Sequence, residues 1–251
     1  MAEVAIFLNS GPLFNGERLE TLEDLPEWKE ADAAAQEAYH RIREAFEKHS
    51  TLLAGNPTAV ETRYYMVGPV LHALGFTHSV FEPIELPDGR VARVDHVLFD
   101  SASEFNEAEP VRGSVSFFRE SLGIVRAVEW GSDFSGNSLV EPKPPPPVEE
   151  GEEPIPAPPM PKPLEAGIPP AVELDLLLRS TGRDFGILTN GCDWRLYHRS
   201  SSSLLNAFFQ ADMIAALKSD FEDFKRFYLL FRKGAFVKTD GITCFLDGFV
   251  A

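Results

Sequence analysis

The spacing of apolar and polar residues along the chain predicts several amphipathic helices. Apolar residues recur every three or four positions over 30–49 and 220–236, which is typical of helices with one buried face. A further helix is expected from Thr58 to Leu74, with a kink near Gly68, because Pro69 lacks the amide hydrogen that a continuous helix needs. Shorter helical segments are expected at 172–180 and 212–218.

Alternating residues and short apolar runs between these helices predict strands. The predicted strands cover 80–86, 91–99, 122–130, 185–188, 194–197 and 204–210. Asp88-Gly89 and Asn190-Gly191 fall between consecutive strands, and each favours a tight hairpin turn because glycine tolerates positive φ angles. For Asn190-Gly191 we expect a two-residue turn. Helices interspersed with strands predict a fold of the α/β (α+β) class.

The composition divides the chain unevenly. Thirteen of the 20 prolines lie in residues 142–170 beside a run of glutamates, so this stretch is predicted to be a disordered insertion. A proline-rich ligand for an aromatic groove is the alternative for the same stretch. We expect an N-terminal arm and helix over 1–50 and a main domain over 51–251. The pattern stops without a closing element, which predicts either a truncated chain or the first module of a longer protein.

Charge and cysteine content narrow the classes of function. The net charge of −16 disfavours a protein that coats DNA, although residues 171–251 balance ten basic against ten acidic side chains. The two cysteines give neither a disulfide framework nor the spacing of a metal site. The sequence shows no signal peptide and no apolar run of membrane-spanning length, so we expect a cytoplasmic protein without a membrane partner.

Several short motifs follow one another in an order that resembles a known family. They are Leu13-Phe14 with Trp28, Asn56 to Glu61 with Pro69–Gly75, Asp95–Phe99, Arg126–Gly131, Pro170–Leu178 and Gly186–Tyr197. Together they resemble the N-terminal PD-(D/E)XK nuclease-like domain of large restriction–modification and phage-defence proteins, of the type IIG-like, methyltransferase-fused kind. The resemblance implies a restriction-endonuclease-like core with a central mixed sheet flanked by helices.

The resemblance also implies a Mg²⁺ site made of two carboxylates and a lysine. Asp95 matches the first carboxylate, and Glu61 matches a supporting glutamate on a helix. The family's Glu and Lys positions are occupied by Arg126 and Val128, which can neither ligate a cation nor activate water. Glu129 is a displaced candidate ligand. No cofactor is therefore expected, or Mg²⁺ on Asp95 and Glu61 if the site is active. We further expect Arg126 to pair with Asp95 or Glu61 and to support the fold without a metal.

Three functions remain open from the sequence. The first is a catalytically inactive, nuclease-derived module that contacts DNA or acts as a scaffold, with DNA, a C-terminal methyltransferase module or other defence-system subunits as partners. Its candidate DNA-binding residues are Arg183, Arg195 and Arg199. The second is an active Mg²⁺-dependent endonuclease rebuilt around Asp95 and Glu129, with a lysine that the sequence does not identify. The third is a protein-interaction module that uses its acidic and proline-rich segments.

Overall fold

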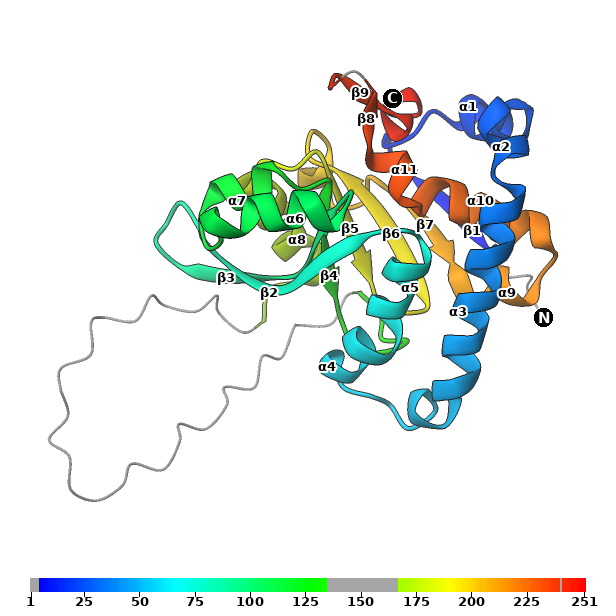
Figure 1. The fold of residues 1–251 in the computed structure, drawn as a ribbon, viewed down its shortest axis with the longest axis horizontal. Helices are drawn as coiled ribbons and strands as arrows, with labels where there is room; N and C mark the ends of the chain where they lie inside the picture. The colour runs from blue at the N-terminus through cyan, green and yellow to red at the C-terminus, as the bar shows by residue number, and fades with distance from the viewer. Residues whose placement is uncertain (1–4, 135–166, 240) are drawn as a thin grey trace, which may run out of the picture.

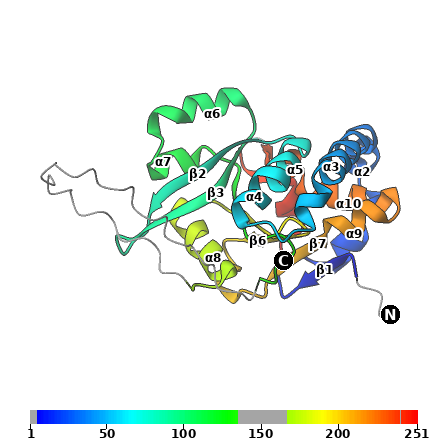
Figure 2. The same cartoon turned by 90° about the horizontal axis from the view of Figure 1, so that it is seen from below.

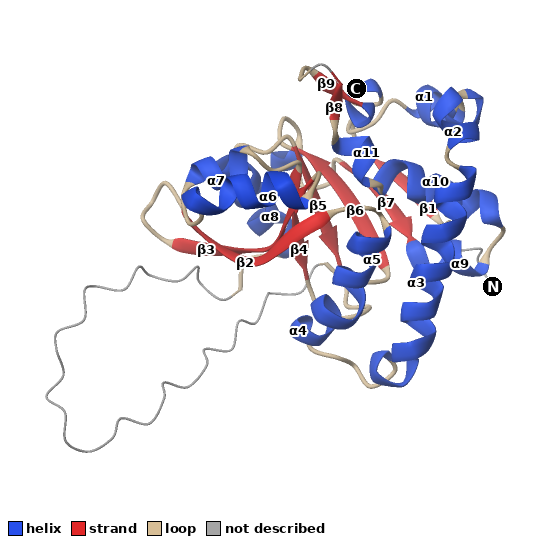
Figure 3. Cartoon of the chain, viewed as in Figure 1, coloured by secondary structure: helices blue, strands red, loops and turns tan. Residues whose placement is uncertain are grey.

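A mixed seven-stranded sheet forms the centre of the molecule, with helices packed around it (Figures 1 and 3). The structure is a computed structural model that describes residues 5–134, 167–239 and 241–251. The spatial order of the strands is β1-β7-β6-β5-β4-β3-β2. β4 and β5 are parallel, and the other neighbouring pairs are antiparallel. These observations confirm the predicted α/β class with a central mixed sheet.

The strands of the central sheet are β1 (Phe7–Ser10), β2 (Thr77–Glu85), β3 (Val91–Phe99), β4 (Gly123–Ala127), β5 (Phe185–Thr189), β6 (Asp193–His198) and β7 (Phe208–Asp212). A small second sheet pairs β8 (Lys238–Thr239) with β9 (Thr243–Cys244).

The α-helices are α1 (Gly16–Glu20), α2 (Pro26–Glu30), α3 (Asp32–Leu53), α4 (Ala59–Thr62), α5 (Gly68–Ala73), α6 (Ala102–Ala108), α7 (Val115–Arg119), α8 (Pro170–Thr181), α9 (Met213–Lys218), α10 (Phe221–Phe231) and α11 (Lys233–Phe236). Short 3-10 turns are η1 (Leu22–Asp24), η3 (Glu109–Val111), η4 (Ser202–Leu204) and η5 (Phe245–Gly248), and η2 (Arg63–Val67) is a π-helical segment. Among the described residues, no helix combines the length and apolarity needed to cross a membrane.

The sheet separates two apolar clusters, and consecutive strand residues alternate between them. On β4, Ile124 belongs to one cluster with Leu174 and Leu178 of α8, while Val125 belongs to the other. The second cluster contains buried residues of α3, α5, α9 and α10, including Phe227. In Figure 2, α8 lies near β2 and β3, away from α3 and α10. Side chains of even-numbered β4 residues therefore lie on the face of the sheet that α8 covers, and those of odd-numbered residues lie on the opposite face.

The helical region between residues 58 and 75 contains a local irregularity in place of a simple kink. Thr58 caps α4, and Pro69 stands in the first turn of α5. The five residues Arg63–Val67 between them are π-helical, so the chain passes from α4 to α5 through a widened turn. This turn sets the position of Arg63 relative to the sheet.

The Asn190-Gly191 hairpin is confirmed, but its turn is longer than predicted. Three residues separate β5 from β6, and only Gly191 has a positive φ, +84°. The Asn190 side chain accepts hydrogen bonds from the backbone amides of Cys192 (2.9 Å) and Asp193 (2.6 Å). The side chain of asparagine thus stabilises the turn in the way that short polar residues commonly do.

Other boundaries differ from the prediction. The strand expected at 204–210 begins only at Phe208, because Leu205 adopts a left-handed φ of +56° after η4. The strand expected at 122–130 ends at Ala127. Residues 7–10 form an edge strand, β1, which pairs with β7. The predicted insertion over 142–170 lies outside the described residues up to position 166.

Candidate functional site

Asp95 lies where β3 and β4 part. The two strands pair from His96 to Leu98 of β3, and next to this ladder the Asp95 carboxylate accepts the backbone amide hydrogen of Ala127 (2.8 Å) through Oδ2. On the other side, the register between β2 and β3 passes from Val80 to Glu82 and omits Phe81. Asp95 is 2% exposed, so its carboxylate must find its partners inside the protein.

Two arginines bind the two oxygens of this carboxylate. Nη1 of Arg63 lies 2.5 Å from Oδ1 of Asp95, and Nη1 of Arg126 lies 2.5 Å from Oδ2. Arg63 comes from the π-helical turn and stacks its guanidinium 4.2 Å from the ring centroid of Phe81. Phe81 has a φ of +59°, an uncommon conformation for a bulky residue. The backbone irregularities of η2 and β2 thus meet at the arginine that binds Asp95.

A second carboxylate completes the cluster from α8. Nε of Arg126 lies 2.7 Å from Oε2 of Glu173, and its Nη1 also donates to the backbone carbonyl oxygen of Ala127 (2.9 Å). We call Arg63, Asp95, Arg126 and Glu173 the charge network. Its two formal positive charges balance its two formal negative charges, and all four residues are buried.

The environment keeps the Asp95–Arg126 pair ionised. Burial by itself raises the pKa of Asp95, but the charges of Arg126 and Arg63 and the Ala127 amide hold it below its ordinary value. Burial lowers the pKa of Arg126, yet the carboxylates of Asp95 and Glu173 raise it overall. At Glu173 burial outweighs Arg126 and raises the pKa, and at Arg63 burial lowers it. The chemistry available here is ion pairing between fixed charges.

The expected pairing of Arg126 with Asp95 is confirmed, and its expected alternative, pairing with Glu61, is wrong. Oε2 of Glu61 accepts hydrogen bonds from the backbone amide and the hydroxyl of Thr58, both at 2.8 Å. These bonds lower the pKa of Glu61. The glutamate closes the N-terminal turn of α4, where a capping box engages its carboxylate.

The structure does not bring Glu129 to Asp95 either. β4 ends at Ala127, so Glu129 lies in an exposed turn, where its backbone carbonyl accepts the Ser132 hydroxyl (2.8 Å). Val128, at the position where the resemblance expects lysine, is 7% exposed and packs in the cluster that contains Leu174. Asp95 is buried and Glu129 is exposed, so the two carboxylates do not form the expected pair of metal ligands.

These residues do not fit a Mg²⁺ site. A divalent cation needs oxygen ligands that are free to face it, and both oxygens of Asp95 face guanidinium groups. Over residues 5–134, 167–239 and 241–251, no three histidine, cysteine, aspartate or glutamate side chains are grouped as a metal site. The metal ligation expected of Asp95 and Glu61 is consequently not supported by the donor set.

The three candidate DNA-binding arginines have separate environments. Arg183 donates to the backbone carbonyl of Ser121 (2.6 Å). Arg195 donates to Gln210 (2.7 Å) and is held between two phenylalanine rings, with centroid distances of 4.3 and 4.1 Å. Arg199 pairs with Asp184 (2.9 Å) and is 46% exposed. Arg199 is thus the most accessible of the three for a phosphate. The guanidinium of Arg195 is already engaged by Gln210 and the two rings.

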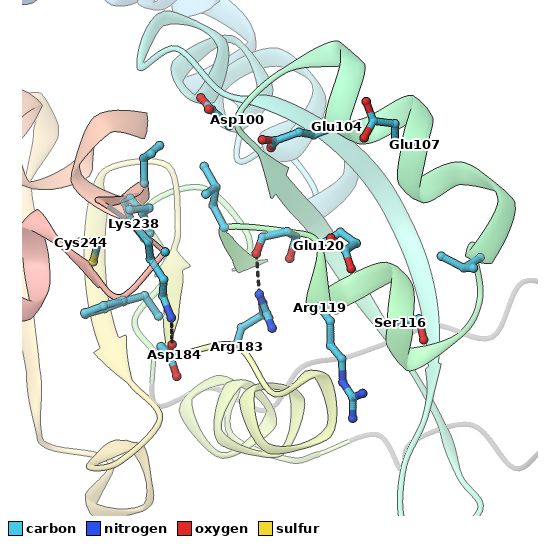
Figure 4. A pocket seen from close by; sticks show the side chains of 17 residues that line it. Asp100, Glu104, Glu107, Ser116, Arg119, Glu120, Arg183, Asp184, Lys238 and Cys244 are labelled. Atoms are coloured by element: carbon cyan, nitrogen blue, oxygen red, sulfur yellow. Dashed lines mark hydrogen bonds and ion pairs between the residues drawn. The ribbon is translucent and has the colours of Figure 1, made fainter.

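Arg183 lines a cleft of about 960 Å³ at the end of the sheet where β4 and β5 begin. Figure 4 shows Glu104 and Glu107 of α6 on one side and Asp184 paired with Lys238 on another, with Arg183 near Glu120. Five acidic side chains line this cleft beside three basic ones, Arg119, Arg183 and Lys238, and this excess of negative charge disfavours DNA backbone there. Arg199 instead borders a surface pocket of about 480 Å³ with Arg179, His198 and Ser200.

Sequence reasoning missed Arg63 and Glu173 as parts of the site. Arg63 is the one charged residue among buried Thr62, Met66 and Val67, which marks it as an inward-facing cation. Glu173 lies beside Leu174 in α8 and offers no comparable signal, because a glutamate in the first turn of a helix is usually solvated. No protein-family model, curated protein or solved structure matches the chain.

Proposed function

We propose that this chain is a nuclease-derived, non-cleaving module with a PD-(D/E)XK-like core, which contacts DNA or serves as a scaffold in a bacterial restriction–modification or phage-defence protein of the cytoplasm. The observation that carries the proposal is the closure of Asp95 by Arg63 and Arg126. Asp95 stands where the resemblance expects a metal ligand, but both of its carboxylate oxygens form ion pairs with arginines. Val128 supports the same conclusion, because an aliphatic side chain cannot activate water.

The surface around Arg179 and Arg199 favours DNA contact over pure scaffolding. Both arginines are about half exposed, at 50% and 46%, and they border the same pocket with His198. Each pairs with one aspartate, Asp175 or Asp184. Exposed ion pairs of this kind are weak, so a DNA phosphate can compete for the guanidinium groups.

Cleavage and retention in one experiment test the proposal. The chain is incubated with supercoiled plasmid in Mg²⁺ and in Mn²⁺, beside an Asp95→Ala/Glu129→Ala variant. We expect no cleavage, and gel retention of a DNA duplex that falls steeply as salt rises. Cleavage that the double substitution abolishes would establish the active endonuclease instead. If the chain neither cleaves nor retains DNA, the result favours the protein-interaction module.

A matched pair of variants locates the DNA-contacting surface. Arg179→Ala/Arg199→Ala should weaken retention and reduce its salt dependence, because two phosphate contacts are lost. Arg41→Ala/Arg43→Ala removes the same charge from α3, where both arginines are exposed and paired with glutamates. Equal weakening by both variants would indicate a nonspecific charge effect and would overturn this assignment of the surface.

A further inference from the structure

The cleft of about 960 Å³ where β4 and β5 begin combines acidic and apolar walls. α6 contributes Glu104 and Glu107, and Glu120 follows the last residue of α7. Residues three apart on a helix share a face, so the two α6 carboxylates lie on the same side of the cleft (Figure 4). We call these three residues the glutamate group. The apolar wall consists of Leu122, Phe185, Phe236 and Val237.

The basic side chains of the cleft are bound elsewhere or directed away from the glutamate group. Arg183 donates to the Ser121 carbonyl oxygen (2.6 Å), and Lys238 pairs with Asp184 (3.0 Å). Figure 4 shows Arg119 extending away from α6. In the described part of the chain, no basic side chain forms an ion pair with any member of the glutamate group. Three carboxylates of the cleft are therefore available to a cationic ligand.

The apolar wall narrows the chemical class of that cation. A small ion would meet the carboxylates without using the apolar side chains, whereas a methylene chain lying on Leu122 and Val237 loses apolar surface to water. Ammonium groups donate strong, charge-assisted hydrogen bonds to carboxylates. The volume of the cleft is within the range of about 300–1,000 Å³ that is usual for small-molecule sites. A ligand with several ammonium groups on an aliphatic chain matches both walls.

We propose that this cleft binds a linear aliphatic polyamine, with its ammonium groups on the glutamate group and its methylene segments against the apolar wall. The inference goes beyond the proposed function and does not depend on it. A ligand with three ammonium groups neutralises the three carboxylates. Binding then removes the excess of negative charge beside Arg183.

Titration calorimetry with spermidine, a triamine, tests the inference at about 0.15 M salt, where exposed charges farther apart than about 8 Å are largely screened. The native chain should show a single saturable site. Glu104→Gln/Glu107→Gln/Glu120→Gln should raise the Kd about tenfold or more, because three ion pairs are lost. A native chain without a saturable site overturns the proposal.

A matched control separates the cleft from the general attraction of an acidic protein for polycations. Glu20→Gln/Glu30→Gln/Glu44→Gln removes the same charge from exposed positions on α1, α2 and α3. This variant should bind spermidine with a Kd within about twofold of the native value, because screening weakens distant charges. Equal weakening by the two triple variants overturns the assignment to the cleft.

A smaller variant covers a loss of folding in the first triple variant, which circular dichroism would reveal. Glu107→Gln/Glu120→Gln changes only exposed side chains, and it should raise the Kd about threefold or more. An unchanged Kd of this variant overturns the role of the glutamate group.

Two further probes test the class of ligand. Mg²⁺ carries charge without an aliphatic chain, so at equal concentration it should not displace spermidine; displacement would overturn the role of the apolar wall. A tri-lysine peptide should bind more weakly than spermidine, because its backbone amides do not match an apolar surface. Tighter binding of the peptide, lost in the first triple variant, would overturn the polyamine in favour of a basic protein segment.

Discussion

The Asn190–Gly191 turn and the charge network lie close together at the end of β4, but they are stabilised in different ways. The turn is held by its own residues: the Asn190 side chain bonds amides two and three positions away. The network joins residues that are 31, 32 and 47 positions apart. Backbone bonds from Val128 to Thr189 (2.9 Å) and from Gly131 to Asn190 (3.0 Å) connect the two regions. Local stereochemistry fixes the first region, and long-range ion pairing fixes the second.

Loss of the central carboxylate should have the largest effect on stability. Asp95→Asn leaves Arg63 and Arg126 buried with one anionic partner between them, so the free energy of unfolding should fall by about 3–5 kcal/mol. Urea denaturation of the native chain and the variant measures the change. Asp88→Asn, which breaks an exposed pair with Arg90, is the control and should leave the curve unchanged. Similar behaviour of the two variants would contradict the importance of the network.

A methyl group at Gly191 tests the local region. An alanine Cβ there would lie 2.5 Å from Cε3 of Trp130, and the φ of +84° is unfavourable for alanine. Gly191→Ala should therefore lower the free energy of unfolding by about 2–3 kcal/mol. Gly89→Ala is the matched control, since Gly89 has a φ of +78° with open space around its Cβ position. Equal losses would show that backbone strain alone matters and that contact with Trp130 is unimportant.

The pH dependence of stability probes the histidine next to the network. Burial, the neighbouring His78 and Arg63 lower the pKa of His96 to about 3, although Asp95 opposes this shift. The unfolded chain thus binds a proton near pH 6.5 that the folded chain refuses, and stability falls as pH decreases from about 6.5 towards 3, by about 1.4 kcal/mol per pH unit. His96→Gln should reduce this slope, as judged by urea denaturation at several pH values, while His78 and His198, whose pKa values burial also lowers, account for the remainder. His40→Gln, an exposed control, should retain it. A slope unchanged in His96→Gln would refute the assignment.

Substitution of Glu61 should have the smallest effect on stability, and it tests whether Glu61 belongs to the charge network. Glu61→Ala removes a capping bond of α4, so its loss of stability should be well below that of Asp95→Asn. Circular dichroism during thermal unfolding measures the difference. A loss as large as that of Asp95→Asn would place Glu61 inside the charge network, against the geometry.

The sequence predicted the features that depend on neighbouring residues. The Asn190–Gly191 hairpin and the amphipathic helices α3 and α10 follow from short-range patterns. The pairing of Arg126 with Asp95 was one of two predicted pairings, because the resemblance places Arg126 where the family has a metal-bound carboxylate.

The sequence could not predict contacts that depend on tertiary packing. Glu173 reaches Arg126 only because α8 packs against β4 and β5. Strand β1 was missed because its exposed and partly buried residues do not alternate, and its partner β7 lies some two hundred positions later. Glu129 was misplaced because β4 ends two residues before it. In each case the deciding interaction lies outside any local window of sequence.

The bonds between the first and last described segments bear on the order in which the protein folds during synthesis. Phe14 forms a β-bridge with Val250, Asn15 donates to the Phe249 carbonyl (2.8 Å), and Arg18 bonds Gly248 from 230 positions away. A ribosome releases the N-terminal segment long before these partners emerge. Leu13 and Phe14, both buried in the finished fold, therefore cannot complete their packing until synthesis has passed residue 250.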